Sequence, residues 1–343
     1  MANPKNIIVR MPNWIGDAVM GTPILKDLRK ALPQAKITAL CQGVIGQLLS
    51  ADPHIDEILS FQKPSGWIHH LRVFPLIEDL RKGEYDTGIL LTNSLSSAWW
   101  FFRGAVRNRI GFTGRGRGFL LNHALPFPDD VEKIHLVTTY KHLLTPLGIP
   151  LSDTLPKLYV TEEESREARS LLDRQGAPPD SIIIGINPGA AFGSAKCWLP
   201  DRFHAVAKRL LKDPRVWIIL FGDAKGRELT DQIAGDLGER VLNLAGKTQL
   251  RELAAFISLL NVLLTNDSGP MHIASALGVP LVALFGSTSD IKTGPFGNST
   301  VIHKHVECSP CYQRTCPIDF RCMTRIETDE VVDALLKKID ESR

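Results

Sequence analysis

Short apolar runs alternate with amphipathic segments along the whole chain. The runs are bounded by turn residues, which is typical of buried strands, and the segments between them repeat apolar residues at helical spacing. This alternation predicts βαβ units, parallel sheets and right-handed crossovers. We expect strands at 6–11, 36–41, 87–91, 182–186, 216–223, 241–244, 261–266 and 281–287, and helices at 23–32, 135–147, 162–175, 200–211, 250–260, 270–277 and 327–339.

The segment 266–277, NDSGPMHIASAL, combines a strand end with a helix start. Asp267 and Ser268 are good N-cap residues, and Pro270 suits the first turn of a helix. Free N–H groups and the helix dipole at such an end attract anions, above all phosphates. His272 lies one turn further and could add a donor. An ordinary capped βα turn would show the same pattern.

Other predicted strand ends of the second half also run into small, polar or basic loops. The loop 187–200 is rich in glycine and alanine and contains Lys196, whose alternative role is a solvated surface charge. Asp223 follows another strand and suits either a ribose hydroxyl or a helix cap. Residues 286–288, Gly-Ser-Thr, follow a third. Together these ends predict a nucleotide-diphosphate site.

The first half begins with a strand and the segment 12–21, PNWIGDAVMG, which we expect to be a loop. Asp17 then lies at the carboxyl edge of the sheet, where open α/β sheets bind ligands. Its carboxylate could act as a base, or it could cap the helix that begins near Thr22. Neither G-x-G-x-x-G nor a P-loop occurs, which disfavours an NAD-dependent dehydrogenase and a P-loop nucleotidase.

Arginines are concentrated between residues 103 and 117. Guanidinium groups among glycines suit the recognition of phosphates or carboxylates, whereas a solvated loop with one strand is the alternative. The members are Arg103, Arg107, Arg109, Arg115 and Arg117.

Composition narrows the class of protein. The chain has 343 residues, 44% of them hydrophobic and 22% charged, which predicts a globular protein of two domains. A net charge of +3 gives no reason to expect a nucleic-acid partner. We see no apolar run as long as a membrane span and no signal peptide, so we expect a cytosolic location.

The tail contains Cys308, Cys311, Cys316 and Cys322. One C-x2-C pair followed by unequal spacings is a weak zinc signal, so we favour reduced structural cysteines and keep a metal-binding protein as an alternative. We place an N-terminal domain at 1–160, a second domain at 161–324, and a C-terminal helix at 325–343 that packs back toward the N-terminal domain.

Four motifs together resemble those of the ADP-heptose:lipopolysaccharide heptosyltransferases, most of all their type II branch. They are R-M-P-N-W-I-G-D-A-V-M-G-T-P at 10–23, the NPGAAFGSAKCWLP run at 187–200 with an additional Leu199, NDSGPMH at 266–272, and the cysteine-rich tail. The resemblance covers nearly the whole chain. It implies a GT-B fold, in which two Rossmann-like doubly wound parallel-sheet domains face each other across a cleft.

The resemblance also implies roles for individual residues. Asp17 would be the catalytic base for the acceptor hydroxyl, and Lys196 would lie at the diphosphate and the leaving group. We expect no metal and no cofactor in catalysis. The implied donor-binding residues are Gly189, Ala190, Ala191, Phe192, Lys196, Asp223, Asp267, Ser268, Gly269, Met271 and His272, and the implied acceptor-binding residues are Asn13, Trp14, Arg115 and Arg117.

The activity that the resemblance implies is inverting transfer of L-glycero-D-manno-heptose from ADP-heptose. The acceptor would be the first heptose of the lipopolysaccharide inner core, as in heptosyl-Kdo2-lipid A, at the cytoplasmic face of a Gram-negative inner membrane with peripheral membrane contact. Alternatives are a type I enzyme acting on Kdo2-lipid A, a sugar-nucleotide epimerase of the same build, and a non-catalytic sugar-nucleotide binder.

Overall fold

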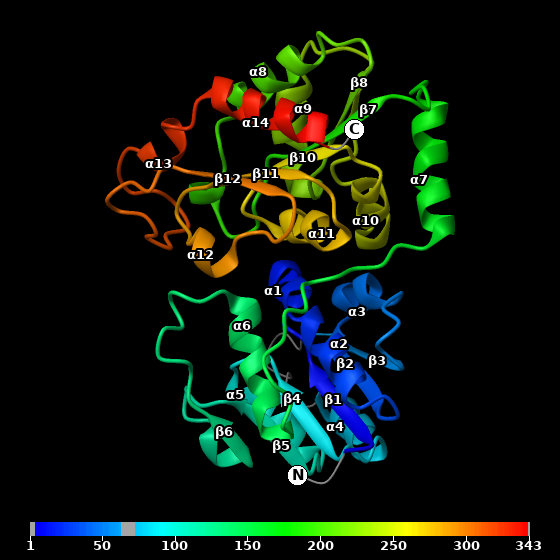
Figure 1. Cartoon of the computed structure of the whole chain (residues 1–343), viewed down its shortest axis with the longest axis vertical. Helices are drawn as coiled ribbons and strands as arrows, with labels where there is room; N and C mark the ends of the chain where they lie inside the picture. The colour runs from blue at the N-terminus through cyan, green and yellow to red at the C-terminus, as the bar shows by residue number, and fades with distance from the viewer. Residues whose placement is uncertain (1–3, 63–72, 342–343) are drawn as a thin grey trace. The chain divides into compact units, whose positions relative to one another are not determined.

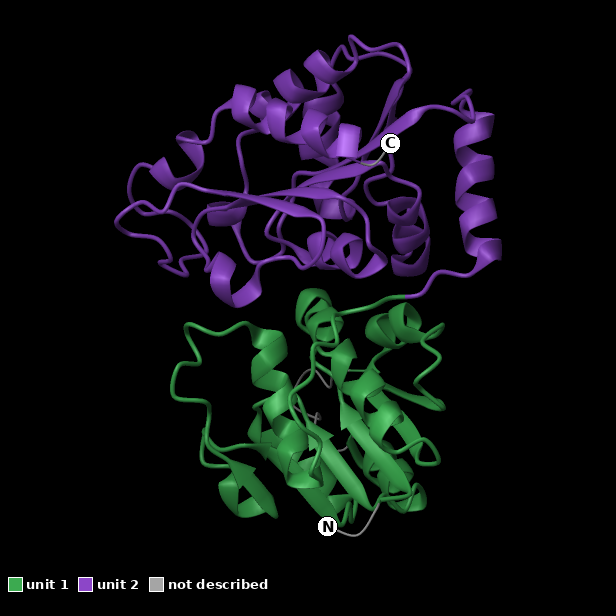
Figure 2. Ribbon diagram, viewed as in Figure 1, with its two compact units in different colours: residues 1–158 green, residues 159–343 purple. Residues whose placement is uncertain are grey.

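The computed structural model describes residues 4–62 and 73–341. The chain divides into two compact units, Met1–Leu158 and Tyr159–Arg343 (Figure 2). Each unit contains one six-stranded sheet in which every strand pair is parallel, with helices on both faces (Figure 1). The predicted α/β class with two doubly wound parallel sheets is confirmed.

Unit 1 has its strands in the order β3-β2-β1-β4-β5-β6. Its core combines aliphatic residues of the sheet with the aromatic side chains of Trp100 and Phe101. The strands are β1 (Asn6–Arg10), β2 (Lys36–Gln42), β3 (Glu57–Phe61), β4 (Thr87–Leu90), β5 (Asn108–Phe112) and β6 (His123–Leu125), and the α-helices are α1 (Ile15–Met20), α2 (Thr22–Ala31), α3 (Gly43–Leu49), α4 (Phe74–Lys82), α5 (Leu95–Arg103) and α6 (Leu136–Lys141).

Unit 2 has its strands in the order β12-β11-β10-β7-β8-β9. The strands are β7 (Ile182–Asn187), β8 (Val216–Leu220), β9 (Val241–Asn243), β10 (Val262–Asn266), β11 (Leu281–Phe285) and β12 (Ser299–His303), and the α-helices are α7 (Glu162–Arg174), α8 (Pro200–Leu210), α9 (Arg227–Ala234), α10 (Leu250–Ser258), α11 (Gly269–Leu277), α12 (Asp290–Thr293), α13 (Arg321–Thr324) and α14 (Thr328–Glu341).

Both sheets have the strand order of a Rossmann fold, in which the chain starts at the centre, builds one half and then returns to build the other. The order reverses between β1 and β4 in unit 1 and between β7 and β10 in unit 2. Ligands of such sheets bind beyond the carboxyl ends of the strands at this reversal. The segments that follow β1, β7 and β10 are therefore expected to form the candidate site.

The segment after β1 differs from the sequence prediction. We expected 12–21 to be a loop, but residues 15–20 form helix α1. Ala18, Val19 and Met20 are buried by this turn of helix, which accounts for the helical conformation despite the short length. Asp17 lies in the first turn of α1 and does not cap α2, whose N-cap is Gly21.

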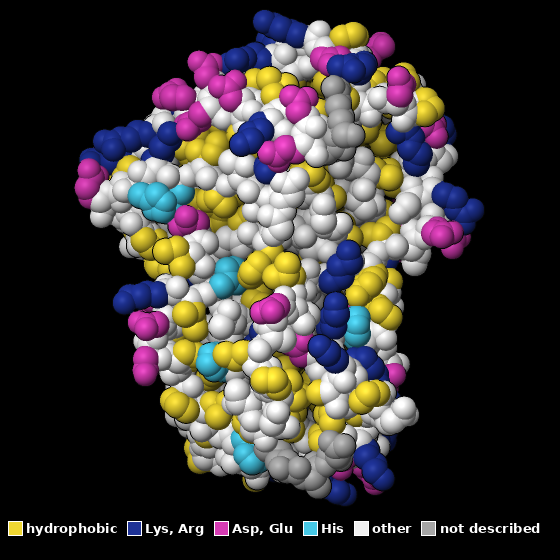
Figure 3. Space-filling view, in the orientation of Figure 1, with side chains coloured by type: hydrophobic (Ala, Val, Ile, Leu, Met, Phe, Trp, Pro, Cys, Tyr) yellow, Lys and Arg dark blue, Asp and Glu magenta, His cyan; other side chains and the backbone are white. Residues whose placement is uncertain are grey.

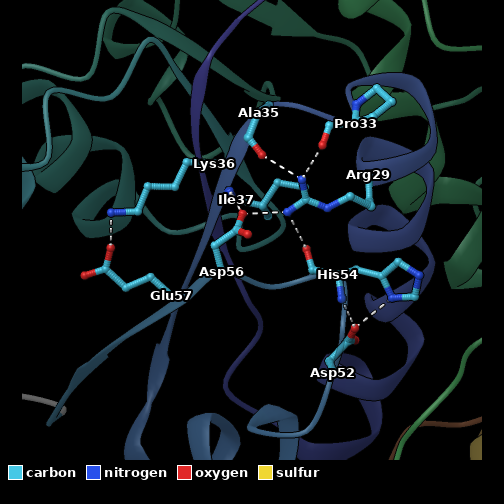
Figure 4. Close-up of polar contacts among 9 residues, drawn as sticks. All are labelled: Arg29, Pro33, Ala35, Lys36, Ile37, Asp52, His54, Asp56 and Glu57. Carbon is cyan, nitrogen blue, oxygen red and sulfur yellow. Dashed lines mark hydrogen bonds and ion pairs between the residues drawn. The ribbon is translucent and has the colours of Figure 1, made fainter.

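At the amino ends of the unit 1 strands, Arg29 connects helix α2 with the starts of β2 and β3. The guanidinium of Arg29, near the end of α2, donates to the carbonyl of Ala35 at 2.8 Å and to Asp56 Oδ2 at 2.5 Å (Figure 4). The same oxygen of Asp56 accepts from Ile37 N at 2.6 Å. These bonds fix the starts of β2 and β3 relative to α2.

The C-terminal helix α14 belongs to the core of unit 2. Val331, Val332, Leu335 and Ile339 pack with side chains of the unit 2 strands and of α8. This apolar face of α14 is therefore part of the unit 2 core. Packing of the helix toward the N-terminal domain stays a prediction.

Charged side chains and helix lengths describe the surface of the two units. On the face seen in Figure 3, lysine and arginine side chains are interspersed with acidic ones over unit 2, whereas several lie close together over unit 1. Among the residues that the structure describes, no helix is both long and apolar enough to cross a bilayer.

Candidate active site

Strands β7 and β10 end beside each other, and each ends in an asparagine. The buried side chain of Asn266 donates through Nδ2 to the carbonyl of Pro188 at 2.6 Å, and its Oδ1 accepts from Trp198 N at 3.1 Å. Both ends of the loop 188–199 are thereby fastened to the end of β10. The many small residues of this loop are held in a defined path at the edge where the strand order reverses.

Asn187 and Ser268 form a second connection across the same edge. Asn187 Nδ2 lies 3.0 Å from Ser268 Oγ and 3.1 Å from the carbonyl oxygen of Gly189. Ser268 is the N-cap residue of α11, as predicted, but its hydroxyl makes no capping bond and instead lies 3.0 Å from Thr265 Oγ1. The first-turn amides of α11 are thus not satisfied by this side chain.

Lys196, Asp267 and Thr288 come together from three different loops. Lys196 Nζ donates to Asp267 Oδ2 at 2.5 Å, and Thr288 Oγ1 donates to the same oxygen at 2.6 Å. The side chains of Lys196 and Asp267 are only 13% and 5% exposed, so this is a buried ion pair. It places one fixed ammonium group beside the N-terminus of α11, as a phosphate site requires.

Arg314 of the C-terminal tail contacts the loop 188–199 at Phe192 and Ala195. Lys196 Nζ lies 4.9 Å and Arg314 Cζ 5.5 Å from the ring centre of Phe192. The carbonyl of Arg314 accepts from Ala195 N at 3.0 Å, and a Cβ added to Gly193 would lie only 2.2 Å from that oxygen. Sequence reasoning missed Arg314, because we interpreted the tail only through its cysteines.

The remaining predicted donor residues differ in accessibility. Gly189, Ala190 and Ala191 are half-buried or exposed on the loop, so their backbone can meet a ligand. Met271 is fully buried, and His272 is 6% exposed within α11. The predicted donor-binding roles of Gly269, Met271 and His272 stay predictions.

Asp223 caps a short helix, which was the alternative to a contact with a ribose hydroxyl. Its Oδ1 accepts from Gly226 N at 2.8 Å and caps the short 3-10 helix Ala224–Gly226. The residue is exposed at the carboxyl end of β8. Contact of its carboxylate with a ribose stays a prediction.

In unit 1, Arg10 organises the carboxyl end of β1. The guanidinium is 2% exposed, lies 4.6 Å from the ring centre of Phe61, and donates to Asn13 Oδ1 at 2.6 Å. Burial lowers the pKa of Arg10 to about 10. Asn13 is thereby oriented at the strand edge beside Trp14, which is 55% exposed.

Asp17 lies one turn beyond, half-buried on α1. Burial first, and then the negative charge of Asp17, raise the pKa of the Tyr140 phenol on α6 well above its ordinary value. The Asp17 carboxylate therefore lies within electrostatic range of Tyr140, beyond the carboxyl end of β1. This position suits a group that accepts a proton from a bound hydroxyl.

The two predicted acceptor arginines have opposite environments. Arg115 is exposed, whereas Arg117 is 0% exposed and donates to the carbonyls of Phe112 and Thr92 and, at 3.0 Å, to Asn93 Oδ1. Burial lowers the pKa of Arg117 to about 10. The prediction that Arg117 faces an acceptor is therefore wrong. Its guanidinium instead satisfies backbone carbonyls that would otherwise be buried without donors.

The four cysteines of the tail are free thiols. Burial first, and then the neighbouring Cys316, Cys308 and Cys311, raise the pKa of Cys322. The sulfur atoms of the tail therefore lie within electrostatic range of Cys322.

Comparison with known proteins agrees with this geometry. Residues 73–320 match the sequence model of glycosyltransferase family 9 (heptosyltransferase). The chain is 32% identical to lipooligosaccharide heptosyltransferase 2 of Haemophilus influenzae, with 88% of this chain and 89% of that protein aligned. It is also 32% identical to lipopolysaccharide heptosyltransferase 2 of Escherichia coli, with 85% and 86% aligned.

A solved structure extends the likeness to three dimensions. The structure of E. coli ADP-heptose lipopolysaccharide heptosyltransferase II superimposes with a TM-score of 0.83 at 29% identity, covering 98% of this chain and 99% of that one. The fold is GT-B. From the family match, the sequence identity and the shared fold, we conclude that this chain is a glycosyltransferase and belongs to glycosyltransferase family 9, the heptosyltransferase family.

Proposed function

We propose that this enzyme transfers L-glycero-D-manno-heptose from ADP-heptose to the first heptose of the lipopolysaccharide inner core. The observation that carries the proposal is the buried pair of Lys196 with Asp267, held at the strand reversal beside a helix N-terminus. Such an arrangement suits a nucleoside diphosphate that must leave with its negative charge. The relatives named heptosyltransferase 2, together with the solved ADP-heptose lipopolysaccharide heptosyltransferase II, support an ADP-heptose donor and a lipopolysaccharide acceptor.

On the donor side, unit 2 would bind the diphosphate through the backbone of the loop 188–199, the first turn of α11 and the Lys196 ammonium. Charge develops on the diphosphate as the bond between the sugar and phosphate oxygen breaks. A lysine already oriented by Asp267 needs little reorganisation to stabilise that charge. Thr288 holds the shared carboxylate oxygen, so it would act as a positioning residue.

On the acceptor side, Asp17 would take the proton of the attacking hydroxyl. The new bond forms between that oxygen and the anomeric carbon while the bond to the diphosphate breaks, and a single displacement of this kind inverts the anomeric centre. Asn13, Trp14 and the exposed Arg115 would contact the acceptor. Because the acceptor is a lipid, we place the enzyme at the cytoplasmic face of the inner membrane, in peripheral contact with it.

The direct test is release of ADP from ADP-heptose in the presence of EDTA. We expect release only when heptosyl-Kdo2-lipid A is added. Release that requires Kdo2-lipid A without heptose would instead assign a type I enzyme. Acceptor-independent consumption of the sugar nucleotide would contradict the transferase proposal and favour an epimerase.

The role of Asp17 is tested by Asp17→Asn, with Asp79→Asn on the exposed face of α4 as the matched control. We expect kcat to fall by about 10²–10⁴-fold, the usual contribution of a general base, while ADP-heptose binding measured by calorimetry stays unchanged. The control should keep its activity. An Asp17→Asn enzyme with unchanged kcat would exclude Asp17 as the base.

A further inference from the structure

Asp290, His303 and His305 form a cluster that plays no part in the proposed chemistry. Asp290 begins α12, His303 ends β12, and His305 follows two residues later. His303 Nδ1 lies 3.0 Å from Asp290 Oδ1, and His305 Nε2 lies 3.7 Å from Asp290 Oδ2. One potential ligand atom from each of the three residues lies within 4.8 Å of the others.

The hydrogen bonds around His303 determine where its proton must be. The Ser309 hydroxyl donates its one hydrogen to the carbonyl of Gly286, which can only accept. His303 Nε2 lies 2.8 Å from Ser309 Oγ and must therefore be the donor in that contact. In a neutral imidazole, Nδ1 then carries a lone pair and faces the carboxylate oxygen of Asp290 at 3.0 Å.

A cation between these two atoms would bind both lone pairs, which face each other at 3.0 Å. The His305 ring lies against His303, with their centroids 4.0 Å apart, and its Nε2 also faces Asp290. His305 is 65% exposed and adopts φ 44°, a conformation that non-glycine residues seldom adopt.

We propose that Asp290, His303 and His305 bind one divalent first-row transition metal ion of the Zn²⁺ class. Two imidazoles and one carboxylate are a ligand set that zinc accepts, with water in the fourth position. Bonds of about 2.0–2.1 Å in a tetrahedron place ligand atoms about 3.3 Å apart. The observed separations are 3.0 Å from His303 Nδ1 to Asp290 Oδ1 and 3.7 Å from His305 Nε2 to Asp290 Oδ2. Ser309 would orient His303 by accepting a hydrogen bond from its Nε2, the ring nitrogen that faces away from the metal.

The pair of His54 and Asp52 in unit 1 shows what an ordinary histidine–aspartate contact looks like in this chain (Figure 4). His54 Nδ1 lies 2.8 Å from Asp52 Oδ1, which also accepts from His54 N at 2.9 Å. Within 4–62 and 73–341, the residues around this pair do not supply a third metal-ligating atom, whereas those around His303 do. His54 is therefore a matched control.

A metal at this position would be structural. Asp290 follows Thr288 by two residues, and Thr288 donates to Asp267 of the candidate active site. Joining the start of α12 to the end of β12 would hold this connection in place. The proposed metal site involves Asp290, His303 and His305 and does not depend on the proposed transferase activity.

The experiment measures Zn²⁺ binding to chelator-stripped protein by equilibrium dialysis and elemental analysis. We expect wild type and His54→Ala to bind one equivalent and His305→Ala to lose it. Since His305 is exposed, its substitution should leave the fold intact. Ser309→Ala should weaken binding by about 10–100-fold. Zn²⁺ should also raise the melting temperature of wild type but not of His305→Ala.

Two results would overturn the proposal. If His305→Ala and Asp290→Asn bind as much Zn²⁺ as wild type, the ion lies elsewhere. Replacing Zn²⁺ with Co²⁺ then identifies the place, because intense thiolate-to-cobalt absorption would assign the ion to the cysteines of the tail. If stripped wild type takes up neither metal, the cluster of Asp290, His303 and His305 is not a metal site.

Discussion

The buried pair of Lys196 and Asp267 gives the sharpest test of the candidate active site. We consider Lys196→Met, which keeps the length of the side chain and removes its charge. The carboxylate of Asp267, 5% exposed, would lose its ammonium partner at 2.5 Å and keep only the hydroxyl of Thr288. Removing one member of a buried pair usually costs about 3–5 kcal/mol, because the other charge stays buried.

The bond from Thr288 reduces this cost. A hydrogen bond to a charged group contributes roughly 1.5–3 kcal/mol, so Asp267 stays partly compensated in Lys196→Met. We therefore expect a loss near the lower limit, about 3 kcal/mol of the free energy of unfolding. Asp267→Asn should cost a similar amount by leaving Lys196 unpaired. The double variant should lose clearly less than the sum, with a coupling energy of about 2 kcal/mol.

Urea unfolding of the four proteins gives this cycle. Hydrogen exchange of peptides from β7, α8, β10 and α11 assigns the change to unit 2, which matters because two-domain chains need not unfold in one step. A coupling energy below about 0.5 kcal/mol would refute the pair as a buried ionic contact, since independent sites add within that limit. In the same proteins, loss of ADP-heptose binding in Lys196→Met is the functional counterpart.

Two further predictions concern residues that hold the loops of each unit. Arg117→Met should lower the free energy of unfolding by about 3 kcal/mol, because several buried carbonyls lose their donor. Arg115 is exposed, so Arg115→Ala should change the free energy of unfolding by less than about 0.5 kcal/mol. The Arg115→Ala enzyme should instead have a several-fold higher KM for the lipid acceptor. Equal stability of the two variants would mean that Arg117 is not structural. Gly193→Ala should lower the free energy of unfolding by about 2 kcal/mol and raise the KM for ADP-heptose, because the new Cβ would lie 2.2 Å from the carbonyl oxygen of Arg314. A Gly193→Ala enzyme as stable as wild type would show that the loop can shift to accommodate the methyl group.

The sequence determined much of the fold of this protein by itself. The runs of β7, β10 and β11 are mostly apolar because parallel strands are covered on both faces, and this pattern can be recognised in the sequence. The turn at 266–270 could also be predicted from the sequence, because N-cap residues and a first-turn proline depend on local backbone geometry. Placement of Lys196 and Asp267 at one sheet edge followed from the parallel topology.

Only the tertiary structure decided which of several chemically suitable residues face solvent and which have a structural role. Arg115 and Arg117 look alike in sequence, yet one faces solvent and the other is buried against carbonyls of distant segments. Asp223 could be a ligand contact or a cap, and only its bond to Gly226 shows the cap. Helix α14 joins unit 2 because its apolar face fits that sheet. Such outcomes depend on contacts between residues far apart in the chain, which local pattern does not encode.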